Sequence, residues 1–562
     1  MVNNKVLLSI FLCLLLLGMG IRSVDLWRPV DGRVRTAWRE CDIAAVARNY
    51  YREGMNILYP RIDWRGNGPG FAEMEFPILS WLMAVGYHIT GIQEIIGRLI
   101  NYVLSLMTIV VFFFLSRRTL SGVGIVGAVH FFVLSPLAVR VSNSLQPEGL
   151  MFFAYILGAF AFIKWIEENK ANYLWLSATA TSIAVLSKAT SAHIGLFYLM
   201  VIIDRKGWKY LFKPKMLIFA AVSLLPALSW YIHAHTFWLD YGNSLGVSNE
   251  YHWIGMDLLL SPAFLKGVAF LELKYVFMPA GVFVAMFGLY DGYRDRCIRY
   301  MLYWVIAIAI FYFLIARTSG DRWAFYYHII SIPPAAILFG RGIISITKNL
   351  SDKFSVYLLI FSTFPIGLIL FNYIFQLFNP IGLKEILVTI FLSALTIFFA
   401  LFATYRPKLS SLNIYHNIFS KQFISLLLSL LITATFIQLA FRTGKAFYPR
   451  RYQKLYSCAN SFINRIPINS LILATGGSCV DKYGKQVAYN ASYFFYWLDR
   501  KGYNICQQEL SIERLNSYRE KVDYLVLEKN SFRFNPNLEN RLAQNFELIE
   551  ECSEAYLFKF QQ

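Results

Sequence analysis

Apolar segments of helical length recur along most of the chain, and short polar loops separate them. A hydrophobic stretch of about 20 residues can cross a bilayer as a helix, so the pattern predicts about thirteen membrane spans. They are expected near residues 5–21, 95–115, 122–139, 149–166, 174–186, 194–203, 216–232, 275–289, 300–316, 326–340, 356–373, 386–403 and 424–441. The first run reads as a retained anchor, because Arg22 follows at once and no small-residue cleavage site comes after it.

The composition agrees with a polytopic α-helical membrane protein. Of the 562 residues, 57% are hydrophobic and only 15% are charged, and the mean hydropathy is +0.47. A soluble globular domain of this length does not show such values. The net charge of +19 raises the question of nucleic acid, but the sequence has no long Lys/Arg-rich tail or basic helix. We therefore expect membrane lipids, and no nucleic acid, as partners.

Lysine and arginine are distributed unevenly between the loops, and this predicts the orientation. Cytoplasmic loops carry an excess of these residues. The rich loops contain Arg117 and Arg118; Lys164 and Lys170; Arg205, Lys206, Lys209, Lys213 and Lys215; Arg294, Arg296 and Arg299; Lys348 and Lys353; and Arg406 and Lys408. This bias puts the N-terminus in the cytoplasm, and an odd number of spans then places the C-terminus outside. The expected location is the plasma (inner) membrane, with a large first external loop over residues 22–94.

The composition changes at about Lys445 to that of a soluble domain. Strands are expected at 471–476, 504–506, 523–528 and 555–560, with helices at 492–502 and 512–520. Alternating strands and helices predict a small external α/β domain over 445–562, after a transmembrane domain over 1–444. The Gly-rich turn at 475–478 is either a phosphate cradle or only a tight turn.

Four of the seven cysteines, Cys458, Cys479, Cys506 and Cys552, fall in this domain. Disulfides persist in oxidising compartments, so two bridges would agree with an external location. The pairing cannot be read from the sequence, and four buried free thiols are the alternative.

The first external loop is unusually polar and carries the candidate chemistry. Nine arginines and no lysine lie between Arg22 and Arg65. Guanidinium groups suit phosphate recognition, although contact with anionic headgroups would explain them equally. Asp42 is expected to begin a helix, DIAAVARNYYRE, where an aspartate is ordinarily an N-cap. Glu40, Glu73 and Glu75 lie in the same loop, which makes an acid–base cluster or a set of salt bridges to the arginines possible.

Three other external loops add polar side chains. Glu148 stands at the mouth of a span, where a carboxylate needs a partner or benefits from the helix dipole. Lys188 lies at a second mouth, where it can pair with a lipid phosphate or simply snorkel. The segment RTSGDRWAFYYHIISIPP supplies Arg322 and His328 at a third.

The order of these features resembles the GT-C type membrane glycosyltransferases. The resemblance rests on a first span, a D-x-x-x-x-A-R-N helix from Asp42, E-F-P before the next span, the Q-P-E at 146–148 and YYHIISIPP at 326–334. The layout is most similar to bacterial relatives of the dolichyl-phosphate-mannose protein mannosyltransferases and to the aminoarabinose lipid A transferase. Many members have Asp-Glu where this chain has Asp42-Ile43, which leaves the second acidic role open.

The resemblance implies that the chain transfers a sugar, with inversion, from a polyprenyl-phosphate carrier to an acceptor on the external face. Asp42 is then the general base, with Glu75 or Glu148 in support. Arg48, Lys188, Arg322 and His328 are candidates for binding the donor phosphate. No His/Cys cluster has metal-ligand spacing, so no cofactor is assigned, and a divalent cation held by Asp42 and the glutamates stays open.

Two other classes of function compete with this interpretation. A transporter or flippase for lipid-linked sugars would usually show repeated halves and polar residues at midplane. This sequence shows no convincing repeat, and its polar residues collect at one membrane face. A structural subunit with an external binding domain would leave the acidic loop without a purpose. The sugar and the acceptor, whether lipid, glycan or protein, are not readable from the sequence.

Overall fold

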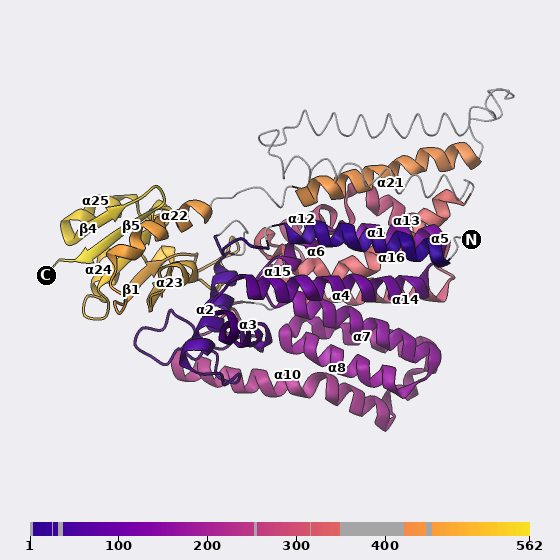
Figure 1. Ribbon diagram of the computed structural model, residues 1–562, viewed down its shortest axis with the longest axis horizontal. Helices are drawn as coiled ribbons and strands as arrows, with labels where there is room; N and C mark the ends of the chain where they lie inside the picture. The colour runs from indigo at the N-terminus through magenta and orange to yellow at the C-terminus, as the bar shows by residue number, and fades with distance from the viewer. Residues whose placement is uncertain are drawn as a thin grey trace.

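The computed structural model describes residues 4–24, 26–31, 37–251, 256–314, 316–348, 421–444, 452–489 and 491–561. Long helices run side by side to form a bundle, and a smaller domain with a β-sheet lies at one end of it (Figure 1). The N-terminus lies at the opposite end of the bundle from this domain.

Helices occupy each of the eleven predicted spans that fall on described residues. Among the described residues, six helices are long and apolar enough to cross a membrane, or up to eight if two bent pairs each form one span. The chain is therefore a multi-pass membrane protein. The other two predicted spans, 356–373 and 386–403, lie outside the described residues. In the described part of the chain, the bundle contains α1 (Asn4–Ser23), α4 (Ile95–Thr119), α5 (Gly122–Val133), α6 (Pro136–Ser142), α7 (Glu148–Glu168), α8 (Ala171–Ser187), α9 (Ile194–Lys206), α10 (Pro214–Tyr241), α12 (Pro262–Leu271), α13 (Pro279–Gly292), α14 (Arg296–Leu314), α16 (Ile332–Thr347) and α21 (Lys421–Gly444).

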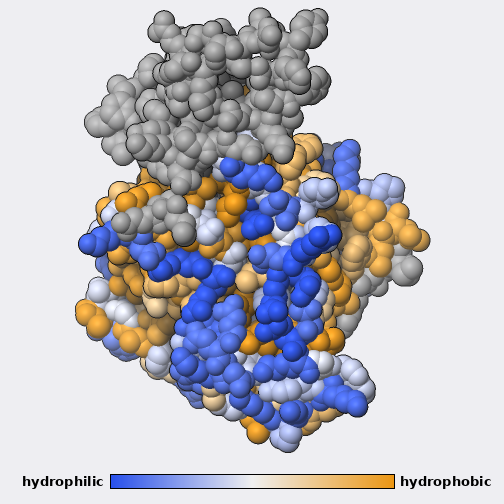
Figure 2. Space-filling view, turned by 90° about the vertical axis from the view of Figure 1, so that its right-hand side faces the viewer, coloured by the Kyte–Doolittle hydropathy of each residue, from blue (hydrophilic) through white to orange (hydrophobic). Residues whose placement is uncertain are grey.

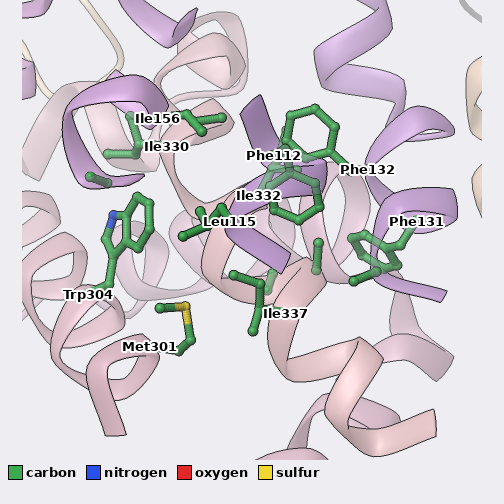
Figure 3. Close-up of a cluster of buried hydrophobic side chains, with 14 of the residues drawn as sticks. Phe112, Leu115, Phe131, Phe132, Ile156, Met301, Trp304, Ile330, Ile332 and Ile337 are labelled. Carbon is green, nitrogen blue, oxygen red and sulfur yellow. The ribbon is translucent and has the colours of Figure 1, made fainter. Parts of the chain in front are cut away.

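Large apolar side chains fill the centre of the bundle. Phe112, Phe132 and Trp304 are buried there with aliphatic side chains from neighbouring helices (Figure 3). Two glycines bring α13 and α16 into close contact: a Cβ on Gly288 would lie 2.0 Å from the carbonyl oxygen of Leu338. A Cβ on Gly342 would lie 1.9 Å from that of Val284. Small residues of this kind let membrane helices approach through their backbones.

The described loops among those predicted to be cytoplasmic lie at the end of the bundle opposite the sheet domain, whereas Lys353, Arg406 and Lys408 fall outside the described residues. Ion pairs join them, including Arg118 with Glu168 at 2.8 Å and Arg299 with Asp204 at 3.2 Å. Figure 2 looks onto this end, where hydrophilic side chains form a band among apolar ones. The described cation-rich loops and the C-terminal domain thus lie at opposite ends of the bundle, and the side of the membrane on which each lies stays a prediction.

Two helices of the loop over residues 22–94, which is predicted to be external, lie between the bundle and the C-terminal domain (Figure 1). They are α2 (Ala37–Glu53) and α3 (Ile78–Thr90), and they pack against each other. The expectation that Asp42 begins a helix is wrong, because α2 starts at Ala37. Ala37 and Cys41 are both buried, so packing extends the helix toward its N-terminus. Asp42 is therefore not an N-cap.

The C-terminal domain contains a five-stranded sheet in the order β2-β1-β3-β5-β4. The three strands β1, β2 and β3 are parallel, and β5 and β4 are antiparallel additions. The four predicted strands are confirmed, whereas β4 was missed because its alternation is weak. The elements are α22 (Tyr452–Phe462), β1 (Ile472–Thr475), α23 (Ser492–Leu498), β2 (Gly502–Ile505), α24 (Ile512–Asn516), β3 (Tyr524–Glu528), α25 (Pro536–Asn545), β4 (Phe546–Glu551) and β5 (Ala555–Phe560). The expected boundary at 444/445 adjoins residues outside the described part and stays a prediction.

Helix α23 differs from its prediction in length and in burial. It ends at Leu498, not at Gly502, because Asp499 adopts a left-handed conformation with φ 54°. All seven of its residues are buried, since it lies against both the C-terminal core and α2. The sequence of this segment predicts one exposed face, but both faces of α23 are buried because the helix lies at a domain interface.

Two disulfides form within the C-terminal domain. Cys458 pairs with Cys552, and Cys479 pairs with Cys506. The alternative of four free thiols is therefore wrong. The first bridge joins α22 to the end of β4, and the second clamps the loop that follows β1.

The Cys458–Cys552 bridge closes a loop with a sequence separation of 94 residues. The chain-entropy account gives about 4 to 5 kcal/mol of stabilisation for such a loop. Replacing both cysteines by serine is expected to lower the temperature at which protease cuts the C-terminal domain of the full-length protein. Cys297→Ser is the control, because Cys297 is a free thiol in the membrane domain. Equal protease resistance of the two variants would contradict the prediction.

Candidate active site

Four charged side chains from four separate segments meet below the C-terminal domain. Arg39 comes from α2, Glu75 precedes α3, Glu148 is the first residue of α7, and Lys188 follows α8. One Arg39 nitrogen lies 2.6 Å from Glu75 and 3.3 Å from Glu148. The Lys188 Nζ lies 2.7 Å from Glu148 and 3.5 Å from Glu75. These residues form the charge cluster, in which each cation contacts both carboxylates.

The charge cluster is buried and backed by aromatic rings. Its side chains expose at most 14% of their surface. Arg39 lies 5.5 Å from the ring centre of Tyr326, and Lys188 lies 4.5 Å from that of Tyr327. Both tyrosines belong to η4 (Arg322–Ser331). Such rings favour cations by their negative faces, which helps to keep both charges out of water.

Two polar atoms of the charge cluster have no hydrogen-bond partner within the described part of the chain. They are the Arg39 Nε and the Glu148 Oε2. A buried donor or acceptor without a partner costs free energy. The cluster therefore has unused capacity for the polar atoms of a ligand.

The two cations keep Glu75 ionised. Burial alone would raise its pKa, but Arg39 and Lys188 outweigh that effect and hold the pKa of Glu75 at about 2. A carboxylate with so low a pKa is a poor proton acceptor near neutral pH. Glu75 is thus suited to orienting Arg39 and Lys188 rather than to taking a proton.

Asp42 has the opposite electrostatic character. It lies on α2 one turn beyond Arg39, and the Trp64 indole donates to it at 3.3 Å. Burial raises the pKa of Asp42 to about 8, against the opposing effects of the Trp64 hydrogen bond and the Arg39 charge. A carboxyl group that titrates near physiological pH is suited to general acid–base chemistry.

Arg48 lies away from the charge cluster. Its guanidinium donates to Asp63 at 2.5 Å and to the Tyr496 carbonyl at 3.1 Å, and it lies 2.9 Å from Asp499. These contacts fasten α2 to the C-terminal domain. The structure thus gives Arg48 protein partners, and it does not bring Arg48 to the residues expected to share its ligand.

Arg322 and His328 lie on η4 but face different surroundings. Arg322 is exposed over the Phe270 ring and lines a cavity of about 1320 Å³ between the bundle and the C-terminal domain, here called the interdomain cavity. His328 is buried, with Nδ1 2.7 Å from Glu272 and Nε2 3.0 Å from the Ser319 carbonyl. Its two ring nitrogens are occupied, so His328 supports η4 rather than facing the cavity.

Glu73 and Glu75 have different partners, and only Glu75 belongs to the charge cluster. Glu73 accepts hydrogen bonds from Ser244 at 2.7 Å and Ser248 at 2.9 Å, and it lies 2.9 Å from His235 Nδ1. This network holds the loop after α10. The salt-bridge interpretation therefore suits Glu75, while Glu73 has a separate hydrogen-bonded role.

A metal site is not evident around Asp42 within the described ranges. Among the described residues, the one group with metal-ligand spacing is Cys479, Cys506 and Glu509, which lies in the C-terminal domain. Its two cysteines are joined in a disulfide. Thiolates, not a disulfide, bind metals.

Sequence reasoning missed Arg39 as a member of the site. Arg39 was counted only among the nine arginines between Arg22 and Arg65, because the helix was expected to begin at Asp42. A helix beginning at Ala37 would have put Arg39 and Asp42 on neighbouring turns of one face. Glu75, Glu148 and Lys188 were all predicted, and the structure brings these three together.

Comparison with known proteins supports the architecture. The family described as dolichyl-phosphate-mannose-protein mannosyltransferase matches residues 74–233. An uncharacterized protein of Aquifex aeolicus is 27% identical over 132 residues, which is 22% of this chain and 26% of that protein. The chain thus matches about a quarter of the length of that relative.

Two solved structures are similar over almost the whole chain. ArnT from Cupriavidus metallidurans bound to undecaprenyl phosphate superposes with a TM-score of 0.57 at 14% identity, covering 99% of this chain and 98% of that one. The apo state of the same protein gives a TM-score of 0.54 at 13% identity, covering 98% and 97%. At this identity the likeness concerns the fold. The chain therefore has the fold of the GT-C type membrane glycosyltransferases.

Proposed function

We propose that the protein transfers a sugar from a polyprenyl-phosphate carrier to an acceptor hydroxyl at the membrane face that bears the C-terminal domain. The observation that carries this proposal is the buried charge cluster at the external ends of α7 and α8, in a fold shared with a protein solved with undecaprenyl phosphate. Two cations at that position suit a phosphate leaving group, and the carboxylates hold the cations in place.

The proposed reaction exchanges one bond for another at the anomeric carbon of the donor sugar. The acceptor oxygen attacks this carbon while its bond to the phosphate oxygen breaks, so the configuration inverts. Polyprenyl phosphate leaves with the bonding electron pair, and Lys188 and Arg39 stabilise the negative charge that develops. The acceptor proton passes to Asp42. Glu75 and Glu148 orient the two cations.

The same proposal includes the topology and the domain organisation. The N-terminus and the cation-rich loops lie in the cytoplasm, and the domain over 445–562 lies outside the plasma (inner) membrane, beyond a transmembrane domain over 1–444. The two disulfides support an oxidising location for the C-terminal domain. The acceptor is a lipid, glycan or protein. The flippase alternative is distinguished by the first test below.

Asp42→Asn is expected to abolish the release of free polyprenyl phosphate from polyprenyl-phosphate sugars by purified protein in bilayers with a crude membrane acceptor. The amide keeps the shape of the side chain but cannot take the acceptor proton, and loss of a general base costs about 10²- to 10⁴-fold in rate. Asp240→Asn is the control, because Asp240 is exposed at the end of α10. Full activity of Asp42→Asn would remove Asp42 as the base. Wild-type protein that moves the donor across the bilayer without releasing the phosphate would favour a flippase.

The pH dependence follows from the raised pKa of Asp42. A base works only when deprotonated, so the rate at limiting acceptor is expected to rise with pH through a midpoint near pH 8 and to level off about one pH unit higher. Glu40 is a possible confounder, because burial, opposed by Arg98, raises its pKa to about 7. The pH profile of Glu40→Gln should keep the wild-type midpoint. A rate that is flat between pH 6 and about 9 would contradict the assignment of Asp42.

Lys188→Met is expected to raise the KM for the donor by about 10- to 100-fold, because a charge-assisted hydrogen bond to phosphate contributes about 1.5–3 kcal/mol. Lys188→Arg should recover much of the affinity. The double variant Lys188→Met/Glu148→Gln removes the buried negative charge that the single variant leaves behind. It should restore thermal stability without restoring donor affinity. An unchanged KM in Lys188→Met would show that Lys188 does not contact the donor.

A further inference from the structure

A second concentration of charge lies where α9 ends and α10 begins, at the end of the bundle opposite the C-terminal domain. The segment over 205–215 joins these helices and includes the short helix η2 (Trp208–Phe212). It contains five cations and no carboxylate: Arg205, Lys206, Lys209, Lys213 and Lys215. In the proposed topology the segment lies at the cytoplasmic surface of the membrane, where anionic lipid headgroups are found.

Three of these lysines converge on two aromatic rings. The Nζ atoms of Lys206 and Lys215 lie 5.0 Å and 5.8 Å from a ring centre of Trp165, which belongs to α7. Those of Lys206 and Lys213 lie 4.9 Å and 4.7 Å from the ring centre of Tyr210 on η2. The two rings are themselves 6.4 Å apart. Lys206, Lys213 and Lys215 thus form a compact group, here called the lysine cluster.

No residue of the lysine cluster forms an ion pair with a carboxylate of the described part of the chain. The carboxylates at this end of the bundle pair with other cations. Glu168 lies 2.8 Å from Arg118, and Asp204 lies 3.2 Å from Arg299. The lysine cluster therefore differs from the neighbouring loops, because the described protein supplies no negative charge to it.

The ammonium groups of the lysine cluster disfavour one another. Lys206 lies beyond the predicted span over 194–203. Burial lowers its pKa, and the nearby charge of Lys215 lowers the pKa further. An anion bound among the three ammonium groups would replace this repulsion by attraction. The shared ring faces keep the groups close enough for one anion to contact several of them.

Apolar side chains beside the lysine cluster face outward. Trp208 and Phe212 on η2 are both largely exposed, and so are Leu217 and Ile218 in the first turns of α10. Large exposed rings are typical of the boundary between lipid and water. The surroundings of the lysine cluster therefore suit a ligand that has an anionic head and apolar chains.

We propose that the lysine cluster is a binding site for an anionic glycerophospholipid of the cytoplasmic leaflet. The phosphodiester lies among Lys206, Lys213 and Lys215, and the acyl chains lie along the exposed apolar face of α10. The bound lipid connects α7, α9 and α10 and stabilises the bundle. The site lies at the opposite end of the bundle from the charge cluster, so its occupancy does not depend on the proposed sugar transfer.

The test measures lipid binding by native mass spectrometry of the full-length protein in maltoside micelles. The probes are dioctanoyl phosphatidylglycerol, dioctanoyl phosphatidylcholine, and glycerol 3-phosphate, which has the anionic group without the chains. Wild-type protein is expected to bind phosphatidylglycerol about 20-fold more tightly than either other probe, because each lysine near an anionic headgroup contributes about fivefold. Lys206→Met/Lys215→Met should remove most of this preference, and Lys206→Arg/Lys215→Arg should keep it.

The melting temperature provides a second readout. Without anionic lipid, Lys206→Met/Lys215→Met should melt no lower than wild-type protein, because removing two crowded cations relieves repulsion. Phosphatidylglycerol should raise the melting temperature of wild-type protein by about 2 °C or more, and it should raise that of the double variant much less. Lys170→Met is the matched control, because Lys170 lies at the same end of the bundle but pairs with Glu168 at 3.1 Å.

Equal binding of the two lipids would overturn the proposal, and so would a preference for phosphatidylglycerol that Lys206→Met/Lys215→Met leaves intact. Glycerol 3-phosphate that binds as tightly as phosphatidylglycerol would show a site for soluble anions and would also overturn it. A lower melting temperature of the double variant without anionic lipid would assign the two lysines to the stability of the protein itself. None of these readouts needs turnover, so absence of polyprenyl phosphate release would count against the transferase function alone.

Discussion

The charge cluster sets the strictest physical requirement on this structure. Arg39, Glu75, Glu148 and Lys188 are nearly removed from water, and an unpaired buried charge would cost several kcal/mol. This cost is offset because each of the two cations contacts both carboxylates. The loop between α1 and α4 and the ends of α7 and α8 must therefore be positioned together, and each depends on the others.

The C-terminal domain maintains that arrangement from the other side. Helix α23 packs on α2, and the Ser492 hydroxyl donates to the Trp38 carbonyl at 2.6 Å, beside Arg39. Arg48 and Arg52 both reach Asp499, whose left-handed conformation ends α23. The domain thus covers Asp42 and keeps it away from water, which is the physical cause of its raised pKa. Removing the domain would change the chemistry of Asp42 as well as the stability of the chain.

Two regions of different chemistry adjoin each other at this end of the bundle. The charge cluster is tight and nearly closed, while the interdomain cavity is wide and has exposed cations. Tyr326 and Tyr327 on η4 border the cluster, and Arg322 on the same segment borders the cavity. Because His328 is held by Glu272 and Ser319, η4 is fixed between the two regions. Segment η4 thus contributes side chains to both regions.

The sequence by itself determined the features that depend on local pattern. Apolar length predicted the membrane spans, loop charge separated the two ends, and alternation identified four of the five strands, because each signal lies within one segment. Glu75, Glu148 and Lys188 stood out as polar residues at the mouths of spans. Only the tertiary structure decided that these three residues meet and that Arg39 contacts the two glutamates. It also decided that Arg48 pairs with Asp63 and Asp499 instead. These contacts join segments that lie far apart in the chain. The local pattern of a sequence does not determine which distant charge a buried group will contact.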